Sequence, residues 1–301
     1  MVNSIRKIIV PTDFSDLSAV AARSAASLAT PSAASIHLLH VIRLPFLHST
    51  YDLNVPEAVW DSLRRGTHER MDETQQELEG LGVTDVHQIV SESLPPAEAI
   101  AQSAKKLDAD LVIMATHGRQ GLKHAFAGSV TERTVRTCPA PVLTIKGSGL
   151  SESPIRRILL ATDFSSHAKQ ALSLACSFAK KFDAHVDVVH VLDESPDYIR
   201  VLSAEIVRFE NQVREMAGEH LEAMGTQVQA ANLSSQTHLC KGRAVEMITS
   251  EAERLESDLI VMGTHGHTGF SHVTLGSVAE RTLRTAPCSV LTTHTKEDQE
   301  A

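Results

Sequence analysis

The strongest constraint on the fold is that the two halves of this chain of 301 residues are similar in sequence, so the chain is an internal repeat. The segment IRKIIVPTDFSDLSAVAARSAASLA, from Ile5, matches IRRILLATDFSSHAKQALSLACSFA, from Ile155. Near the end of each copy, AGSVTERTVRTCPAPVLTI, from Ala127, matches LGSVAERTLRTAPCSVLTT, from Leu275. The offset between the copies is 150 residues at the front and 148 at the back. Because each copy has the length of an ordinary domain, the repeat predicts two similar domains.

The boundary between the copies is marked by composition. The stretch KGSGLSESP, from Lys146 to Pro154, is rich in Gly, Ser and Pro, as linkers are. It predicts a first domain over residues 1–146, a linker over 147–154 and a second domain over 155–301.

Within each copy, short β-branched apolar runs alternate with helical patterns. In the first copy the apolar runs predict strands over residues 7–12, 36–42, 86–92, 110–116 and 141–145. Apolar residues that recur at spacings of three and four predict helices over 15–29, 56–80, 96–106 and 129–137. Nearly continuous apolar strands separated by helices are typical of a parallel sheet covered on both faces. We therefore expect an α/β protein with two doubly wound, five-stranded domains.

Composition excludes several classes of partner. The net charge of −9 and the aromatic content of 4% argue against nucleic acid, which requires clustered cations or stacking platforms. The chain contains no apolar run near the ~20 residues that a membrane span requires, so we expect no membrane partner. Four widely spaced cysteines without a CxxC motif are typical of reduced thiols in a cytoplasmic protein.

Two features of each copy fall at the carboxyl ends of predicted strands, where doubly wound sheets bind ligands. The first is TDFS, Thr12–Ser15 and again Thr162–Ser165. Its serine is a natural helix N-cap, and its aspartate either tightens the turn or faces a ligand.

The second feature is a glycine loop after the fourth strand. In the second copy it reads GTHGHTGFSHVTLGS, from Gly263 to Ser277, and it leads directly into a helix. Glycines allow backbone N–H groups to approach a ligand closely, and a helix start favours an anion. Together with the aspartate and the repetition, this pattern favours a phosphate over a structural turn.

These motifs resemble those of the universal stress protein family, and the resemblance covers essentially the whole chain as a tandem of two such domains. ATP-binding members carry G-x2-G-x9-G-[ST], which Gly263, Gly266, Gly276 and Ser277 match. The resemblance implies an adenine nucleotide alpha-hydrolase-like sheet of strand order 3-2-1-4-5. It also implies that the last strands pair the two domains into an internal dimer with pseudo-twofold symmetry.

The resemblance further implies an ATP site in the second copy, with Mg²⁺ bound to the nucleotide. Asp163 and the backbone around Val191 would hold the adenosine end above Ala161 and Thr162. Gly263, Thr264, His265, Gly266 and His267 would surround the ribose and phosphates. Gly276, Ser277 and Val278 would donate to the terminal phosphates from the helix start.

The first copy departs from the family pattern at one position. The matching residues are Thr12, Asp13, Val41, Gly118, Gly128 and Ser129, whereas Ala115 stands where the first glycine is expected. If that position needs a positive φ, the methyl group costs about 1–2 kcal/mol. If the backbone is extended, only the closeness of the Cβ atom to the ligand matters. We therefore expect a weakened site, which Lys123 could partly restore by pairing with phosphate.

The sequence predicts binding rather than catalysis. No GxxxxGK[ST] motif is present, and the loop of the second copy contains no Lys or Arg, so we expect slow or negligible ATP hydrolysis. His265, His267 and His272 are the candidates for proton transfer there. The 16 histidines do not have the spacing of a closed metal site. AMP or a flavin remains an alternative ligand.

The alternative from another class is a scaffold that works without nucleotide. The two copies diverge most over residues 43–60 and 193–209, where Tyr51, Trp60, Tyr198 and Phe209 either dock an unknown protein partner or, as we expect, pack over the sheet. The sequence leaves open whether two tandem chains form a homodimer.

Overall fold

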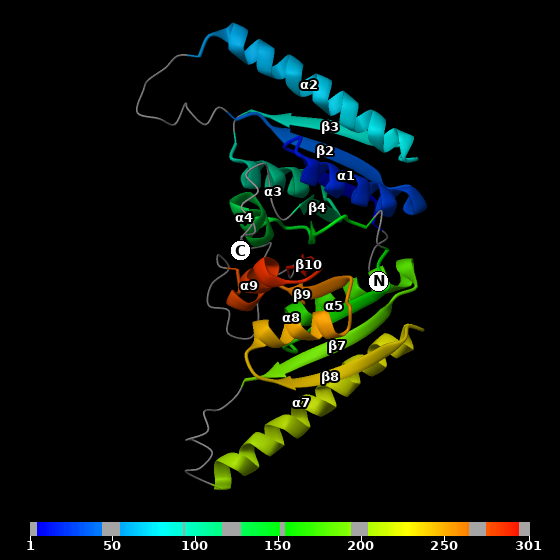
Figure 1. The fold of residues 1–301 in the computed structure, drawn as a ribbon, viewed down its shortest axis with the longest axis vertical. Helices are drawn as coiled ribbons and strands as arrows, with labels where there is room; N and C mark the ends of the chain where they lie inside the picture. Colours follow the sequence, from blue (N-terminus) through cyan, green and yellow to red (C-terminus); the bar gives the residue numbers. More distant parts are fainter. Residues whose placement is uncertain are drawn as a thin grey trace. The chain divides into compact units, whose positions relative to one another are not determined.

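The computed structural model describes residues 5–43, 55–92, 94–115, 128–150, 154–193, 204–264 and 275–294. The chain divides into two compact units between Glu152 and Ser153. We call them the N-terminal unit and the C-terminal unit, and describe each by itself. Figure 1 distinguishes them by colour, from blue to green and from green to red.

The N-terminal unit is a five-stranded parallel sheet with helices between its strands. The order along the chain is β1 (Lys7–Pro11), α1 (Asp16–Ala29), the 3-10 turn η1 (Thr30–Ser32), β2 (Ser35–Val41), α2 (Glu57–Gly80), β3 (Val86–Ser91), α3 (Pro96–Leu107), β4 (Leu111–Ala115), α4 (Ser129–Thr137) and β5 (Val142–Ile145). The strands lie side by side in the order β3-β2-β1-β4-β5, and neighbours run parallel.

The C-terminal unit repeats this arrangement. It comprises β6 (Arg157–Ala161), α5 (Ser166–Phe182), β7 (His185–Leu192), α7 (Ala204–Ala230), β8 (Ser235–Lys241), α8 (Ala244–Arg254), β9 (Leu259–Gly263), α9 (Ser277–Thr285) and β10 (Ser289–Thr293). The strand order β8-β7-β6-β9-β10 is the same 3-2-1-4-5 order, again with parallel neighbours. The predicted fold class, parallel sheets and strand order are confirmed.

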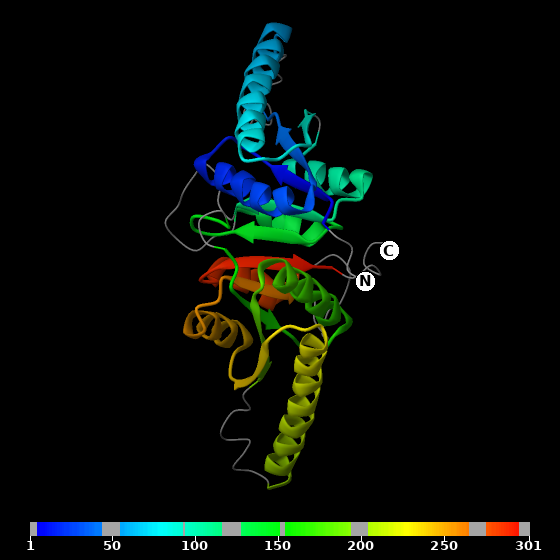
Figure 2. The ribbon, with the colours of Figure 1, turned by 90° about the vertical axis from the view of Figure 1, so that its right-hand side faces the viewer.

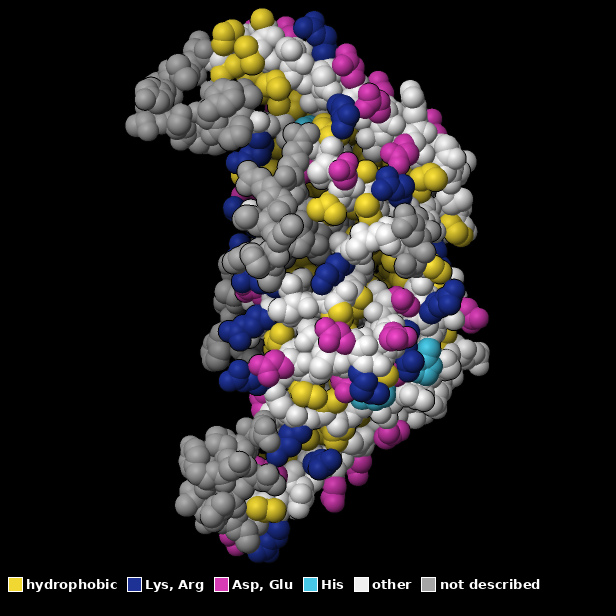
Figure 3. Space-filling view, in the orientation of Figure 1, with side chains coloured by type: hydrophobic (Ala, Val, Ile, Leu, Met, Phe, Trp, Pro, Cys, Tyr) yellow, Lys and Arg dark blue, Asp and Glu magenta, His cyan; other side chains and the backbone are white. Residues whose placement is uncertain are grey.

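Each sheet is covered on both faces, as the continuous apolar strands require. In the N-terminal unit, α1 packs with α2 on one face and α3 packs with α4 on the other (Figure 2). The middle of each central strand is completely buried, with Ile8–Val10 and Ile158–Leu160 at 0% exposure. No helix in the described ranges is both long and apolar enough to cross a membrane. Lys and Arg are mixed with Asp and Glu over the face drawn in Figure 3.

The start of the predicted linker is ordered against the N-terminal unit. Leu150 is 5% exposed, and its N–H donates to Ser24 Oγ at 3.0 Å. Gly149 has φ of +83°, and a Cβ atom there would clash with Ser24 Oγ. Glycine is therefore required at position 149 for residues 147–150 to pack closely against α1. The Gly/Ser composition of the linker does not by itself reveal this packing.

A buried carboxylate, paired with a partly exposed arginine, distinguishes the core of the C-terminal unit. The Asp187 side chain on β7 is 0% exposed and accepts from Arg157 Nε at 2.6 Å and from His238 Nε2 at 2.7 Å. Arg254 donates to the other ring nitrogen of His238 at 3.4 Å. Burial pushes the pKa of Asp187 upward, but the hydrogen bonds from Arg157 and His238 outweigh it and hold the pKa below its ordinary value. The N-terminal unit has His37 at this position.

Candidate functional site

The topology places one crevice in each unit at the carboxyl ends of the first and fourth strands, β1 with β4 and β6 with β9. These are the neighbouring strands at which the strand order reverses, and ligands of doubly wound sheets bind there. TDFS follows β6 and the glycine loop follows β9, so the two predicted motifs border the same crevice.

The aspartate of TDFS closes a tight turn. Asp163 Oδ1 accepts the Ser165 N–H at 3.1 Å, and Ser165 Oγ accepts the Ala168 N–H at 3.3 Å as the N-cap of α5. In the N-terminal unit Asp13 Oδ1 likewise accepts the Ser15 N–H at 3.1 Å. The predicted N-caps are confirmed, and the turn-tightening role of the aspartate is present in both units.

A histidine that the sequence analysis did not single out holds this turn in place. His190 Nδ1 lies 2.8 Å from the Thr162 carbonyl oxygen, and because a carbonyl only accepts, Nδ1 carries the proton. The His190 ring lies 4.3 Å from the Phe164 ring, and Phe164 has φ of +67°. That left-handed conformation is costly for a residue with a side chain, so these contacts stabilise a strained turn next to Asp163.

The N-terminal unit contains the same arrangement. His40 Nδ1 lies 2.8 Å from the Thr12 carbonyl oxygen and 4.3 Å separates its ring from that of Phe14, whose φ is +60°. In sequence, the signal was an HV dipeptide at the same place in both copies, His40-Val41 and His190-Val191.

The first glycine position lies in extended backbone. Gly263 is the last residue of β9 and pairs with Thr293, and Ala115 is the last residue of β4 and pairs with Ile145. Neither residue has a positive φ. Of the two alternatives for Ala115, the structure therefore favours the second: the alanine causes no backbone strain, and only the position of its Cβ atom matters.

The glycine loop returns to the point at which it leaves the sheet. The Gly276 N–H donates to the Thr264 carbonyl oxygen at 2.9 Å, which ties the two ends of the loop together. Thr264 is itself 0% exposed, and its N–H donates to the Thr293 carbonyl oxygen at 3.0 Å. His265, Gly266, His267 and His272 lie outside the described residues.

The helix after this loop starts without a side-chain cap. Gly276 is the N-cap of α9 and has no side chain to accept the N–H groups of the first turn. The start of α5, by contrast, is capped by Ser165. The N–H groups at the start of α9 must find other partners, and together with the helix dipole they favour an anion.

A cavity of about 310 Å³ joins these elements in the C-terminal unit. Nine of the twelve residues predicted for the nucleotide site line it: Ala161, Thr162, Asp163, Val191, Gly263, Thr264, Gly276, Ser277 and Val278. The other three are His265, Gly266 and His267, outside the described part of the chain. The structure thus brings together every predicted residue of this site that it describes.

Eight further residues line the same cavity, and the sequence analysis missed them: Ala168, Val189, His190, Asp193, Ala244, Ile248, Met262 and Ala279. Most are small or apolar residues inside predicted strands and helices, where sequence alone does not separate a cavity wall from ordinary core. Asp193 and Asp163 both line the cavity, so it contains two carboxylates, while the start of α9 supplies N–H donors. The cavity therefore presents acceptors from one set of residues and anion-binding groups from another.

In the N-terminal unit the predicted residues occupy the equivalent positions. Thr12 and Asp13 follow β1, Val41 ends β2, Ala115 ends β4, and Gly128 and Ser129 begin α4. Thr131 Oγ1 donates to the Ala115 carbonyl oxygen at 3.1 Å, a bond that Ala279 in the C-terminal unit cannot make. Gly118 and Lys123 lie beyond the residues described.

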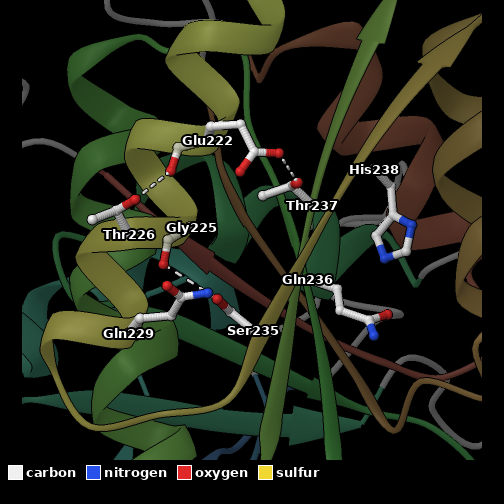
Figure 4. Close-up of a pocket in the computed structure, with 8 residues that line it drawn as sticks. All are labelled: Glu222, Gly225, Thr226, Gln229, Ser235, Gln236, Thr237 and His238. Carbon is white, nitrogen blue, oxygen red and sulfur yellow. Dashed lines mark hydrogen bonds between the residues drawn. The ribbon is translucent and has the colours of Figure 1, made fainter.

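A second cavity, of about 340 Å³, lies at α7 and the edge strand β8 (Figure 4). Its polar groups bond to one another: Thr237 Oγ1 donates to Glu222 Oε1 at 2.6 Å, and Ser235 Oγ donates to the Gly225 carbonyl oxygen at 3.2 Å. These bonds hold α7 against β8, so we assign this groove a structural role.

The comparisons with known proteins agree with this architecture. The model of the universal stress protein family matches residues 4–146 and again 154–294. The chain is 33% identical over 140 residues to a universal stress protein of Methanocaldococcus jannaschii, covering 46% of this chain and 82% of that protein. It is 28% identical over 204 residues to universal stress protein E of Escherichia coli strain K12, covering 65% of this chain and 64% of that protein.

Among solved structures, a universal stress protein from Archaeoglobus fulgidus matches 98% of both chains with a TM-score of 0.74 and 22% identity, which supports the fold alone. Two matches to one family model, end to end, account for the internal repeat. The chain belongs to the universal stress protein family and carries two of its domains in tandem.

Proposed function

We propose that this protein binds ATP in the C-terminal unit and acts as a nucleotide-dependent sensor or regulator in the stress response. One observation carries the proposal: a single cavity joins the carboxylate of Asp163 to the uncapped start of α9. A ligand that fits both must carry hydrogen-bond donors at one end and strong negative charge at the other. A nucleoside triphosphate has both.

In this arrangement the adenosine end lies near Asp163 and Val191, and the phosphates lie at the start of α9. Ser277 supplies a backbone N–H and a hydroxyl at the first position of that helix. Mg²⁺ would be held by phosphate oxygens and water, because it prefers to keep part of its hydration shell.

The cavity wall favours binding over hydrolysis. Among its described lining residues there is no Lys or Arg to stabilise the charge that develops in phosphoryl transfer. We expect turnover to be slow or negligible. If the wild-type protein hydrolyses ATP steadily and the Ser277→Ala variant does not, the protein is instead an ATPase.

The direct test is the nucleotide content of protein purified without added ligand, measured after denaturation, followed by titration with ATP and Mg²⁺. We expect about one ATP per chain, since the N-terminal site is predicted to be weak. Asp163→Ala should lower the bound amount, and Asp13→Ala should leave it unchanged. Wild-type protein that contains no nucleotide and does not bind added ATP would contradict the proposal.

A nucleotide-independent scaffold is the second candidate, and one surface favours it. Phe209, Val213 and Met216 follow one another at helical spacing on α7 and are 65%, 37% and 58% exposed. The expectation that Phe209 packs over the sheet is therefore wrong.

Of the other aromatic residues in the divergent segments, Trp60 is half-buried, and Tyr51 and Tyr198 lie outside the residues described. A stress phenotype retained by a Gly276→Ala variant without bound ATP, but lost in Phe209→Ser, would favour the scaffold.

A further inference from the structure

The crevices of the two units share most of their lining residues, and the lining residues that differ are all larger in the N-terminal unit. Of the 17 residues that line the C-terminal cavity, ten have an identical residue at the repeated position of the N-terminal unit. They include the groups expected to hold the ligand, such as Asp163, Gly276 and Ser277, which repeat as Asp13, Gly128 and Ser129. Every polar side chain of the C-terminal cavity wall except Asp193 is therefore retained in the N-terminal unit.

The other seven positions differ, and at each of them the N-terminal unit has the larger residue. Pro11, Ser18 and Leu39 stand where the C-terminal unit has Ala161, Ala168 and Val189. Arg43, Pro96, Ala115 and Thr131 stand where it has Asp193, Ala244, Gly263 and Ala279. Random drift would enlarge some positions and shrink others, so the uniform direction indicates a crevice with less room.

Two of these residues fill the corner where the glycine loop leaves the sheet. Thr131, in the first turn of α4, is 4% exposed, and its hydroxyl is bonded to the Ala115 carbonyl oxygen at 3.1 Å. The hydroxyl is thus already used and its side chain is held against the end of β4. The equivalent corner of the C-terminal unit is formed by Gly263 and Ala279 and belongs to the cavity wall.

The Ala115 backbone is not the cause of any difference between the units. Ala115 and Gly263 are both extended strand ends, so replacing glycine by alanine there introduces no left-handed strain. What the N-terminal unit adds is side-chain volume, and close-packed walls do not yield readily to additional methyl groups.

We propose that side-chain volume, with Ala115 and Thr131 as its centre, excludes ATP from the N-terminal crevice, and that the small residues Gly263 and Ala279 admit it to the C-terminal one. This inference rests on the proposed function. It assigns the difference between the two units to the cavity wall and not to the groups that would bind the phosphates.

The test is the number of ATP molecules bound per full-length chain, by calorimetric titration with ATP and Mg²⁺. Wild type should bind one. Ala115→Gly with Thr131→Ala should raise the N-terminal affinity at least tenfold, and smaller residues at all seven positions should bring the number to two. Adding Asp13→Ala to the sevenfold variant should return the number of bound ATP molecules to one, which would show that the second ATP binds in the N-terminal crevice. Circular dichroism checks that each variant is folded.

The reciprocal exchange tests the same idea in the other unit. Gly263→Ala with Ala279→Thr should weaken binding at the C-terminal site at least tenfold. For the N-terminal variants, Thr134→Ala is the matched control, because it removes a buried threonine one turn further along α4 that the C-terminal unit also has, as Thr282. It should leave the number of bound ATP molecules at one.

Two results would overturn the inference and leave the proposed function intact: wild type that binds two ATP molecules with similar affinity, or a folded sevenfold variant that still binds one. If neither wild type nor any variant binds ATP, the proposed function fails, and the inference fails with it.

Discussion

At the scale of single residues, the feature that most needs an explanation is a phenylalanine in the left-handed conformation at the same place in both units. Phe14 and Phe164 each follow an aspartate, and the centroid of each ring lies 4.3 Å from that of a histidine ring. That histidine donates to the carbonyl oxygen of the threonine two residues before the phenylalanine. Strain of this kind persists only where surrounding contacts hold it. We infer that His190 acts as a positioning residue for Asp163.

The variant His190→Phe keeps a ring against Phe164 but removes the donor to the Thr162 carbonyl. We expect ATP binding to weaken about tenfold, equivalent to about 1.4 kcal/mol. His190→Asn, which can place an N–H near the position of Nδ1, should recover part of the loss. The matched control is His40→Phe, because it makes the same change in the other unit and should not alter the affinity of the C-terminal site. Equal affinities of His190→Phe and wild type would refute the positioning role.

Asp187 provides a prediction about stability and pH. Asp187→Asn removes the buried negative charge that pairs with Arg157, and we expect a loss of about 3 kcal/mol in the free energy of unfolding at pH 7. The pKa of Asp187 is lowered in the folded state, so its carboxylate stabilises the fold above the ordinary pKa of about 3.9. This contribution is lost as the pH falls through the lowered value.

Urea denaturation of both proteins at several pH values measures this effect. The difference between wild type and Asp187→Asn should be largest near neutral pH and should shrink in acid. Asp183→Asn is the control, since Asp183 is an exposed C-cap with φ of 54°, a conformation that asparagine tolerates. A difference independent of pH would show that the charge of Asp187 is not what stabilises the core.

At the scale of elements, the contact of α7 with β8 depends on a glycine. A Cβ atom on Gly225 would lie 2.8 Å from Thr237 Cγ2, whereas one on Gly218 would meet no atom within 4 Å. Gly225→Ala should therefore destabilise the protein by about 1–3 kcal/mol through overpacking. Gly218→Ala, in the same helix, should stabilise it by up to about 1 kcal/mol because alanine is the better helix former. Chemical denaturation of the two variants would reveal whether they shift stability in opposite directions.

The elements themselves were largely predictable from the sequence. The helix predicted over 129–137 is α4 residue for residue, and the strand predicted over 36–42 is β2 displaced by one residue. The period of apolar residues is a local property, so it is readable from local sequence. The cavity wall was harder to predict, because Ala279 and Ile248 lie within ordinary amphipathic helices and only packing shows which side of each helix faces the cavity.

The ordered start of the linker was hidden for a similar reason. Gly149 looks like a flexible residue by composition, yet its positive φ and its closeness to Ser24 make it part of the N-terminal unit. The left-handed Phe164 was equally unreadable, since phenylalanine itself gives no signal of that conformation.

At the scale of the whole molecule, each unit has its own buried sheet and its own crevice, so a ligand should protect one unit without the other. We expect ATP with Mg²⁺ to slow amide hydrogen exchange in β6, β9 and α9 while β1, β4 and α4 remain unchanged. At a free concentration of 100 times Kd, bound ligand stabilises its unit by about 2.7 kcal/mol. Hydrogen exchange read by mass spectrometry resolves the two halves, and equal protection of both would contradict an asymmetric chain.

The hydrogen bond from Gly276 to Thr264 has a consequence for protein engineering. It joins both ends of the segment between these residues at one fixed point, and Thr264 is anchored to the end of β10. A segment whose two ends are held together tolerates an insertion, because a change in its length costs little loop-closure entropy. Foreign sequence inserted within residues 268–274 would leave His265, Gly266 and His267 in place, so this interval is where we would insert a reporter to make a biosensor of the proposed ATP site.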